Sequence, residues 1–161
     1  MGSEMCIRDS PNCESISSVE QFKGGQSNPT YKILTKTDAY VLRRKPPGKL
    51  LPKAHAVDRE YKVISALEET DVPVPKTFGL CDDHDVVGTP FFMMEFVEGK
   101  VFWDHLLPSC SKTERAQIYR NKNRVIAALH DVDYSAVGLD DFGKTGNYVA
   151  RQVNTLSLIH I

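Results

Sequence analysis

Short apolar stretches of strand length, bounded by glycine and polar turn residues, fill the first third of the chain. They are residues 19–25 (VEQFKGG), 31–37 (YKILTKT) and 39–45 (AYVLRRK). A polar segment at 24–31 (GGQSNPTY) separates the first from the second, and the turn TDA leads into the third. Two strands joined by a glycine-containing connection indicate a β-hairpin. We therefore predict a hairpin followed by a third strand.

The pattern then changes to helical spacing over residues 54–69 (AHAVDREYKVISALEE). Apolar residues recur there at steps of four, three and three, which places them on one face of a helix. These residues are Val57, Tyr61, Ile64 and Leu67. The next segment, 71–83 (DVPVPKTFGLCDD), contains two prolines, so it is predicted to be an edge strand or an extended loop.

One more strand and a long helix follow. Residues 89–99 (TPFFMMEFVEG) form an apolar run of strand length that ends at Gly99. Residues 111–130 read as a helix that begins with capping-box spacing between Ser111 and Glu114. Its predicted inner face carries Ile118, Val125, Ile126 and Leu129. The order of hairpin, strand, helix, strands, linker and long helix indicates an α+β fold, laid out like the small lobe of a kinase-like fold and the start of a large lobe.

Both ends of the chain look foreign to the gene. Residues 5–10 (MCIRDS) and 156–161 (LSLIHI) can be encoded by one short DNA string read in opposite orientations. That string matches the transposase end sequence used in sequencing libraries. We therefore expect residues 1–10 and 156–161 to be adapter-derived tails without tertiary contacts. Between them we expect a small lobe with its hinge at 11–98 and the truncated start of a substrate lobe at 99–155.

Composition excludes several classes of partner. The chain has 20 basic and 21 acidic residues, and removing the one basic and two acidic residues of the tails leaves equal numbers. A balanced charge argues against a nucleic-acid surface and a polybasic membrane contact. No apolar run approaches the roughly 18 residues that span a membrane. The chain has four cysteines, of which Cys6 lies in an expected tail. The remaining three are odd in number and widely spaced, which favours free thiols in a reducing compartment and hence a cytoplasmic location. These cysteines are Cys13, Cys81 and Cys110.

The hairpin loop could hold phosphate. A nucleotide-binding lobe of this layout needs a glycine loop whose backbone N–H groups approach phosphates, a cation on the third strand and a carboxylate on the next helix. Residues 24–28 (GGQSN) could form the loop, and Glu60 could supply the carboxylate. Strand alternation places Val41 and Arg43 on one face and Arg44 on the other. If Val41 lines a base pocket, Arg43 is the cation that points at the phosphates.

Each of these residues also has a simpler interpretation. The glycines could serve a plain hairpin turn, which is the commoner use of such a segment. Arg43 and Arg44 could form a solvated strand edge. Glu60 could be a surface residue paired with Lys53 or Lys62. Only the joint arrangement of loop, arginine and glutamate favours a phosphate site.

Other polar residues carry no predicted chemistry. The histidines lack metal-ligand spacing, so a surface or capping role is expected for His55, His84, His105 and His130. A group of aspartates in a turn-like stretch is expected to be solvated rather than to bind metal: Asp82, Asp83 and Asp85. No metal site is predicted in this chain.

Several consecutive stretches of the sequence match a known protein family. They include QFKGGQSNPTYKI, YVLRRKPPGKLLPKAHAVDREYKVISAL, VVGTPFFMMEFVEGKVFWD and GNYVARQV. In order and spacing they resemble the aminoglycoside phosphotransferase and choline kinase-like superfamily. The resemblance is strongest to the kinase-like domain associated with acyl-CoA dehydrogenases. It implies a protein-kinase-like fold, with a small antiparallel-sheet lobe plus one helix and then the start of a mainly helical large lobe.

The resemblance also implies roles for individual residues. It implies a nucleotide loop formed by Gly24, Gly25, Ser27, Asn28 and Thr30. Arg43 would replace the lysine usual in kinases, and Glu60 would pair with it. Met94 would occupy the gatekeeper position, and the backbones of Glu95 and Val97 would bind adenine. Val41 would line the base pocket.

The implied activity is ATP- and Mg²⁺-dependent phosphorylation of a hydroxyl on a small molecule. A hydroxyacyl-CoA is the favoured acceptor over an aminoglycoside, and an acyl-CoA dehydrogenase would be a fused or separate partner. The family's HGDxxxxN loop, which carries the catalytic Asp and Asn, does not occur in this sequence, so the chain itself is expected to be inactive. The alternatives are a non-catalytic nucleotide-binding pseudokinase or regulatory module, and an interaction domain that binds no nucleotide.

Overall fold

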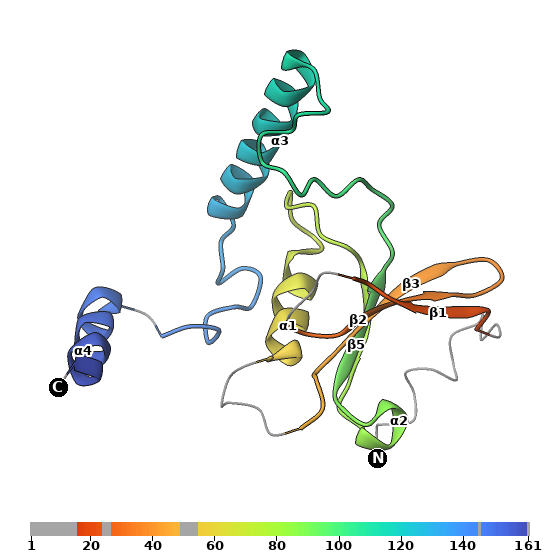
Figure 1. Cartoon of the computed structure of the whole chain (residues 1–161). Coiled ribbons are helices and arrows are strands. Elements are labelled where there is room, and N and C mark those ends of the chain that lie inside the picture. The colour runs from red at the N-terminus through yellow and green to blue at the C-terminus, as the bar shows by residue number, and fades with distance from the viewer. Residues whose placement is uncertain (1–15, 24–26, 49–54, 145, 161) are drawn as a thin grey trace.

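A computed structural model of the chain describes residues 16–23, 27–48, 55–144 and 146–160. The elements within these ranges are, in chain order, β1 (Ser18–Gln21), β2 (Thr30–Leu34), β3 (Ala39–Arg44), α1 (Val57–Leu67), β4 (Thr77–Cys81), α2 (His84–Val87), β5 (Phe91–Glu95), α3 (Lys112–His130) and α4 (Tyr148–His160). Figure 1 shows α1 packed beside the sheet, whereas α3 and α4 stand away from it. The predicted α+β class is confirmed.

The described strands form one antiparallel sheet with the order β1-β2-β3-β5-β4. The predicted hairpin is β1 with β2, and the predicted third strand is β3. The segment with two prolines contains β4, which lies at the edge of the sheet and begins at Thr77, after both prolines. Thr30 lies opposite Arg43 across β2 and β3, and this register places both beside the loop that precedes β2.

The core lies between the sheet and the inner face of α1. Val57 and Phe92 are fully buried, and Leu67 is nearly so. The ring of Tyr61 packs against the ring of Phe92, with centroids 6.0 Å apart. The predicted apolar face of the helix therefore contacts β5 and β4, and this packing fixes the side of α1 that carries Glu60.

The last turn of α1 is tied to β4 by a carboxylate. Glu68 accepts hydrogen bonds from the Thr77 hydroxyl at 2.5 Å and from the Thr77 backbone N–H at 2.6 Å. These two bonds, the hydroxyl first, lower the pKa of Glu68. Because both bonds favour the ionised carboxylate, the link between helix and sheet weakens when Glu68 is protonated.

Replacing Thr77 by valine should raise the pKa of Glu68 back toward its usual range, because the larger of the two causes is removed. A depressed folded-state pKa contributes stability above the unfolded pKa, and this contribution is lost as pH falls through the folded value. Thr77→Val should therefore destabilise the chain at neutral pH and have no such effect in acid. A ¹³C NMR titration of Glu68 measures the shift. The matched control is Thr113→Val on the exposed side of α3, and an equal shift there would contradict the assignment.

Helix α3 begins as predicted. Ser111 accepts from the Glu114 backbone, and the Glu114 carboxylate accepts from the Ser111 backbone, which completes the capping box. The predicted inner face is only partly covered: Ile126 is 50% exposed and Leu129 is 48% exposed. Among the described residues no other element packs closely against α3, and this accounts for the exposure.

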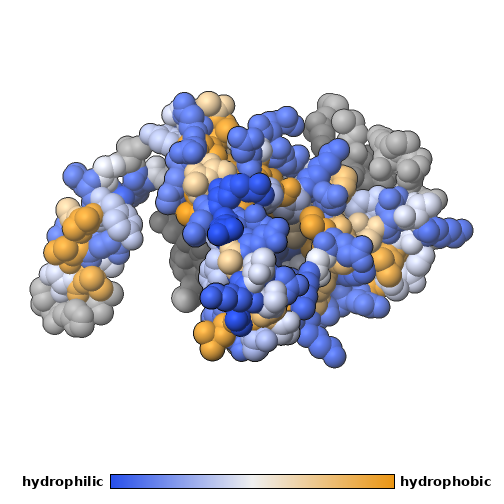
Figure 2. Space-filling view, turned by 90° about the horizontal axis from the view of Figure 1, so that it is seen from above, coloured by the Kyte–Doolittle hydropathy of each residue, from blue (hydrophilic) through white to orange (hydrophobic). Residues whose placement is uncertain are grey.

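Two helices were not predicted. Helix α2 forms within the aspartate-rich segment, where Asp83 caps it by accepting from the Asp85 backbone. Helix α4 includes residues 156–160, one of the expected tails, whereas residues 1–10 lie outside the described residues. Exposed apolar side chains lie along α4, and Figure 2 shows them on the helix at the left. No described helix is long and apolar enough to cross a membrane.

Candidate functional site

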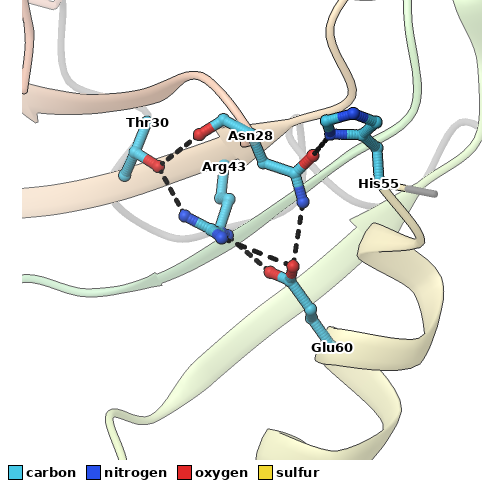
Figure 3. Close-up of polar contacts among 5 residues, drawn as sticks. All are labelled: Asn28, Thr30, Arg43, His55 and Glu60. Carbon is cyan, nitrogen blue, oxygen red and sulfur yellow. Dashed lines mark hydrogen bonds and ion pairs between the residues drawn. The ribbon is translucent and has the colours of Figure 1, made fainter. Parts of the chain in front are cut away.

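Side chains from three stretches of the chain, at 28–30, 43 and 55–60, meet where the start of β2 faces the first turn of α1 (Figure 3). They are Asn28, Thr30, Arg43, His55 and Glu60. The sheet register brings Arg43 beside Thr30, and packing of α1 on the sheet brings Glu60 toward both. The result is a continuous chain of hydrogen bonds around one guanidinium group.

Arg43 and Glu60 form the predicted ion pair. The Arg43 Nε lies 2.5 Å from Glu60 Oε2, and Nη2 lies 3.4 Å from Oε1, so the guanidinium meets the carboxylate edge to edge. A forked contact of this kind fixes the plane of the guanidinium, which a lysine could not do. Lys62, one of the alternative partners of Glu60, instead pairs with Asp141, and Lys53 lies outside the described residues.

Thr30 holds the other side of the guanidinium. Arg43 Nη1 donates to the Thr30 hydroxyl at 2.9 Å, and that hydroxyl donates to the backbone carbonyl of Asn28 at 3.0 Å. These contacts use one N–H on each guanidinium nitrogen of Arg43. One N–H on Nη1 and one on Nη2 therefore have no partner among the described residues. The Arg43 side chain as a whole is 28% exposed, and these two N–H groups are the ones left for a bound anion.

Asn28 and His55 complete the network. Asn28 is 2% exposed, and its Nδ2 donates to Glu60 Oε1 at 2.9 Å. Its Oδ1 lies 2.9 Å from His55 Nδ1. The expectation of a surface or capping role for His55 was wrong. Sequence spacing gave no reason to connect residues 28 and 55, although the position of His55 shortly before the helix of Glu60 was the one available signal.

The predicted loop is only partly described. Gly24 and Gly25 lie outside the described residues, and Ser27 is exposed. Asn28 and Thr30 lie beside Arg43 as the loop prediction requires, but their described contacts are with protein groups. The contact of this loop with phosphate stays a prediction.

The residues predicted to line a base pocket, Val41 and Met94, lie on β3 and β5, and the pocket itself stays a prediction. Val41 is 6% exposed and pairs in register with Met94. The backbone N–H of Glu95 donates to the carbonyl of Lys76 at 2.8 Å, so it is already engaged. Any backbone contact from this stretch to adenine would therefore use other groups, such as the Glu95 carbonyl or the backbone of Val97, whose side chain is 63% exposed.

The outer face of α1 is held by the loop that follows α3. Arg59 donates to the Phe142 carbonyl at 2.7 Å, and its guanidinium lies 3.9 Å from the centroid of the Phe142 ring. Lys62 Nζ lies 2.5 Å from Asp141 Oδ1, and this hydrogen bond lowers the pKa of Asp141. Contacts on both sides of Glu60 along the helix thus connect α1 to the sequence that follows α3.

This geometry agrees with the comparison to known proteins. The profile of the phosphotransferase enzyme family (APH) matches residues 18–159, almost the whole chain. The chain belongs to this family. The match covers the five strands, the network around Arg43 and all of α3, so the family assignment and the site rest on the same residues.

The similar proteins are much longer than this chain. It is 51% identical to "Probable acyl-CoA dehydrogenase IBR3" of Arabidopsis thaliana, covering 84% of this chain and 17% of that protein. It is 42% identical to human acyl-CoA dehydrogenase family member 11, covering 88% and 18%. A crystal structure from Ralstonia eutropha, assigned by name to the aminoglycoside phosphotransferases, is 50% identical with a TM-score of 0.78, covering 92% of this chain and 42% of that one. The predicted kinase-like fold is confirmed.

Proposed function

We propose that this chain is the nucleotide-binding lobe of an ATP-dependent phosphotransferase that phosphorylates a hydroxyl of a small molecule. The guanidinium of Arg43 carries the proposal. It is fixed in plane by Glu60 and Thr30, and it keeps one N–H on each terminal nitrogen for an anion. A fixed cation beside a loop that follows a β-strand suits the phosphates of a nucleotide.

Within this proposal each residue has a physical task. Bound ATP would supply the phosphoryl group. Arg43 would neutralise phosphate oxygens, and Glu60 would hold Arg43 in the orientation that does so. Val41, nearly buried beside Met94, would offer an apolar surface to the base. Positioning and charge neutralisation account for most of phosphoryl-transfer catalysis, so these tasks are part of the activity and not only of binding.

Magnesium does not fit the described part of this chain. No group of three or more His, Cys, Asp or Glu residues there could hold a metal ion. The proposal therefore assigns the magnesium ligands and the acceptor-side base to the HGDxxxxN loop of the longer protein, a motif that this sequence does not contain. The same reasoning leads us to propose that the chain alone is inactive.

A hydroxyacyl-CoA is the acceptor we favour. The support is that relatives 42–51% identical to the chain are named acyl-CoA dehydrogenases, so the kinase-like region would form a phosphate ester on a substrate that such an enzyme handles. A dehydrogenase, fused or separate, is the corresponding partner. The resemblance in name of the Ralstonia protein supports an aminoglycoside less well, since its fold is shared by both groups.

The test is phosphoryl transfer by the full-length protein that contains this chain. It is incubated with ATP, Mg²⁺ and separate panels of hydroxyacyl-CoAs and aminoglycosides, and products are identified by mass spectrometry. We expect a phosphorylated acyl-CoA and no turnover by the 161-residue chain alone. Turnover on aminoglycosides only would refute the acceptor class. Nucleotide binding without turnover on any acceptor would favour the pseudokinase, and absence of nucleotide binding would refute the proposal.

A further inference from the structure

The hydrogen bonds around Asn28 can run in only one direction. The Glu60 carboxylate, paired with Arg43, accepts hydrogen bonds and donates none, so the Asn28 amide must turn its NH₂ group toward Glu60. The Asn28 carbonyl then faces His55. Because a carbonyl oxygen only accepts, the His55 Nδ1 must carry a proton. One carboxylate thus determines the orientation of an amide and the tautomer of an imidazole.

We infer that Asn28 and His55 are positioning residues. Together they hold the Glu60 carboxylate in the orientation in which it binds Arg43. Asn28 supplies a second donor to the same carboxylate oxygen that receives Arg43 Nη2, and His55 holds the amide in the donating orientation. Only the expected effect of these residues on nucleotide affinity rests on the proposed function. The hydrogen-bond order itself is a property of the chain without nucleotide.

Burial makes Asn28 suited to this task. The Glu60 side chain is 36% exposed and flexible, so it has alternative rotamers in solvent. Asn28 is 2% exposed, which leaves its amide no water to bind and makes the bonds to Glu60 and His55 costly to break. A buried amide whose nitrogen and oxygen each have a partner is therefore a better anchor for the carboxylate than a surface group.

The backbone of His55 gives independent support. Its φ is 58°, in the left-handed region that non-glycine residues seldom occupy. Such a conformation persists only where surrounding contacts hold it, and it is commoner at functional positions. Helix α1 begins two residues later, and the backbone N–H of Val57, its first residue, donates to the His55 carbonyl. The unusual conformation thus places the imidazole over Asn28 immediately before the helix that carries Glu60.

Two NMR measurements on the 161-residue chain, with no nucleotide present, test the inference. The first is the ¹⁵N shifts of His55, which distinguish the Nδ1–H from the Nε2–H form of the neutral ring. We expect the Nδ1–H form. The second is the rate at which the Arg43 Nε–H exchanges with solvent. Asn28→Asp keeps the size of the side chain but replaces the donor with a second carboxylate, and we expect exchange to be about tenfold faster, since a hydrogen bond to a charged group is lost.

His55→Ala is the second variant and should speed the same exchange by a smaller factor, because it leaves Asn28 in place but free to rotate. The matched control is His130→Ala at the end of α3, which should leave the Arg43 signal unchanged. In the full-length protein, Asn28→Asp should also weaken ATP binding about tenfold, measured by calorimetry. Failure of the wild type to bind ATP would refute the proposed function but not this inference. The Nε2–H form of His55, or an unchanged Arg43 exchange rate in Asn28→Asp, would overturn it.

Discussion

Replacing Arg43 by alanine in the full-length protein should lower kcat/KM for ATP about 10- to 150-fold, whereas Arg44→Ala should change it by no more than a few-fold. Charge-assisted hydrogen bonds to phosphate are worth about 1.5–3 kcal/mol, and each 1.36 kcal/mol is a factor of ten. Arg43 is the residue that Glu60 and Thr30 hold with N–H groups to spare. Steady-state kinetics at varied ATP concentration measures the difference.

Arg44 is a demanding control because it is adjacent to Arg43 in the sequence, carries the same charge and also makes a hydrogen bond through its guanidinium. Its Nη1 donates to the Val87 carbonyl at 3.1 Å, on the side of the sheet where α2 lies, so it cannot share the contacts of Arg43. Thermal unfolding of both variants separates loss of stability from loss of binding. Equal kinetic losses, or a larger loss for Arg44→Ala, would show that Arg43 is not the phosphate-facing cation.

Sequence reasoning predicted the scaffold because local rules and packing agree there. The proline-containing segment was predicted to be an edge strand or an extended loop, and it contains the edge strand β4. The apolar spacing from Val57 to Leu67 indicated a face that packs on a core, and Ser111 with Glu114 forms the expected cap. Alternation along β3 was enough to place Arg43 and Arg44 on opposite sides. The predicted pair of Arg43 with Glu60 then followed, because α1 crosses the sheet beside β5.

The rest of the site could not be predicted because it depends on long-range side-chain geometry. Asn28 was predicted to belong to the nucleotide loop and not to bind Glu60, and His55 had no motif. The hydrogen bond from Asn28 to Glu60 nevertheless makes both residues part of the Arg43 network. Likewise, β5 could be predicted as a strand, but only its pairing showed that the Glu95 N–H is taken by Lys76. Burial and register decide such contacts, and a single sequence shows neither.

The site and the core are mechanically connected through adjacent residues. Phe92 lies directly opposite Arg43 in the β3–β5 register, and Tyr61, which follows Glu60, packs its ring on Phe92. The adjacent residues Glu60 and Tyr61 therefore provide both the carboxylate that orients Arg43 and a packing contact between α1 and the sheet. Changing the core beneath α1 should affect the distance between Arg43 and Glu60 as well as stability.

Phe92→Ala should accordingly have the largest effect on stability, about 3–5 kcal/mol, because it empties a fully buried site beneath α1. Urea unfolding followed by circular dichroism measures it, and Phe92→Leu, expected to cost roughly 1–1.5 kcal/mol, keeps the test open if the alanine variant does not fold. The matched control is Phe78→Ala in β4, where the ring is 49% exposed and makes a T-shaped contact with the Tyr40 ring. A loss for Phe78→Ala as large as that for Phe92→Ala would mean that the core does not lie under α1. Because Tyr61 of α1 loses its ring contact with Phe92, Phe92→Leu should also speed exchange of the Arg43 Nε–H, while Phe78→Ala should not.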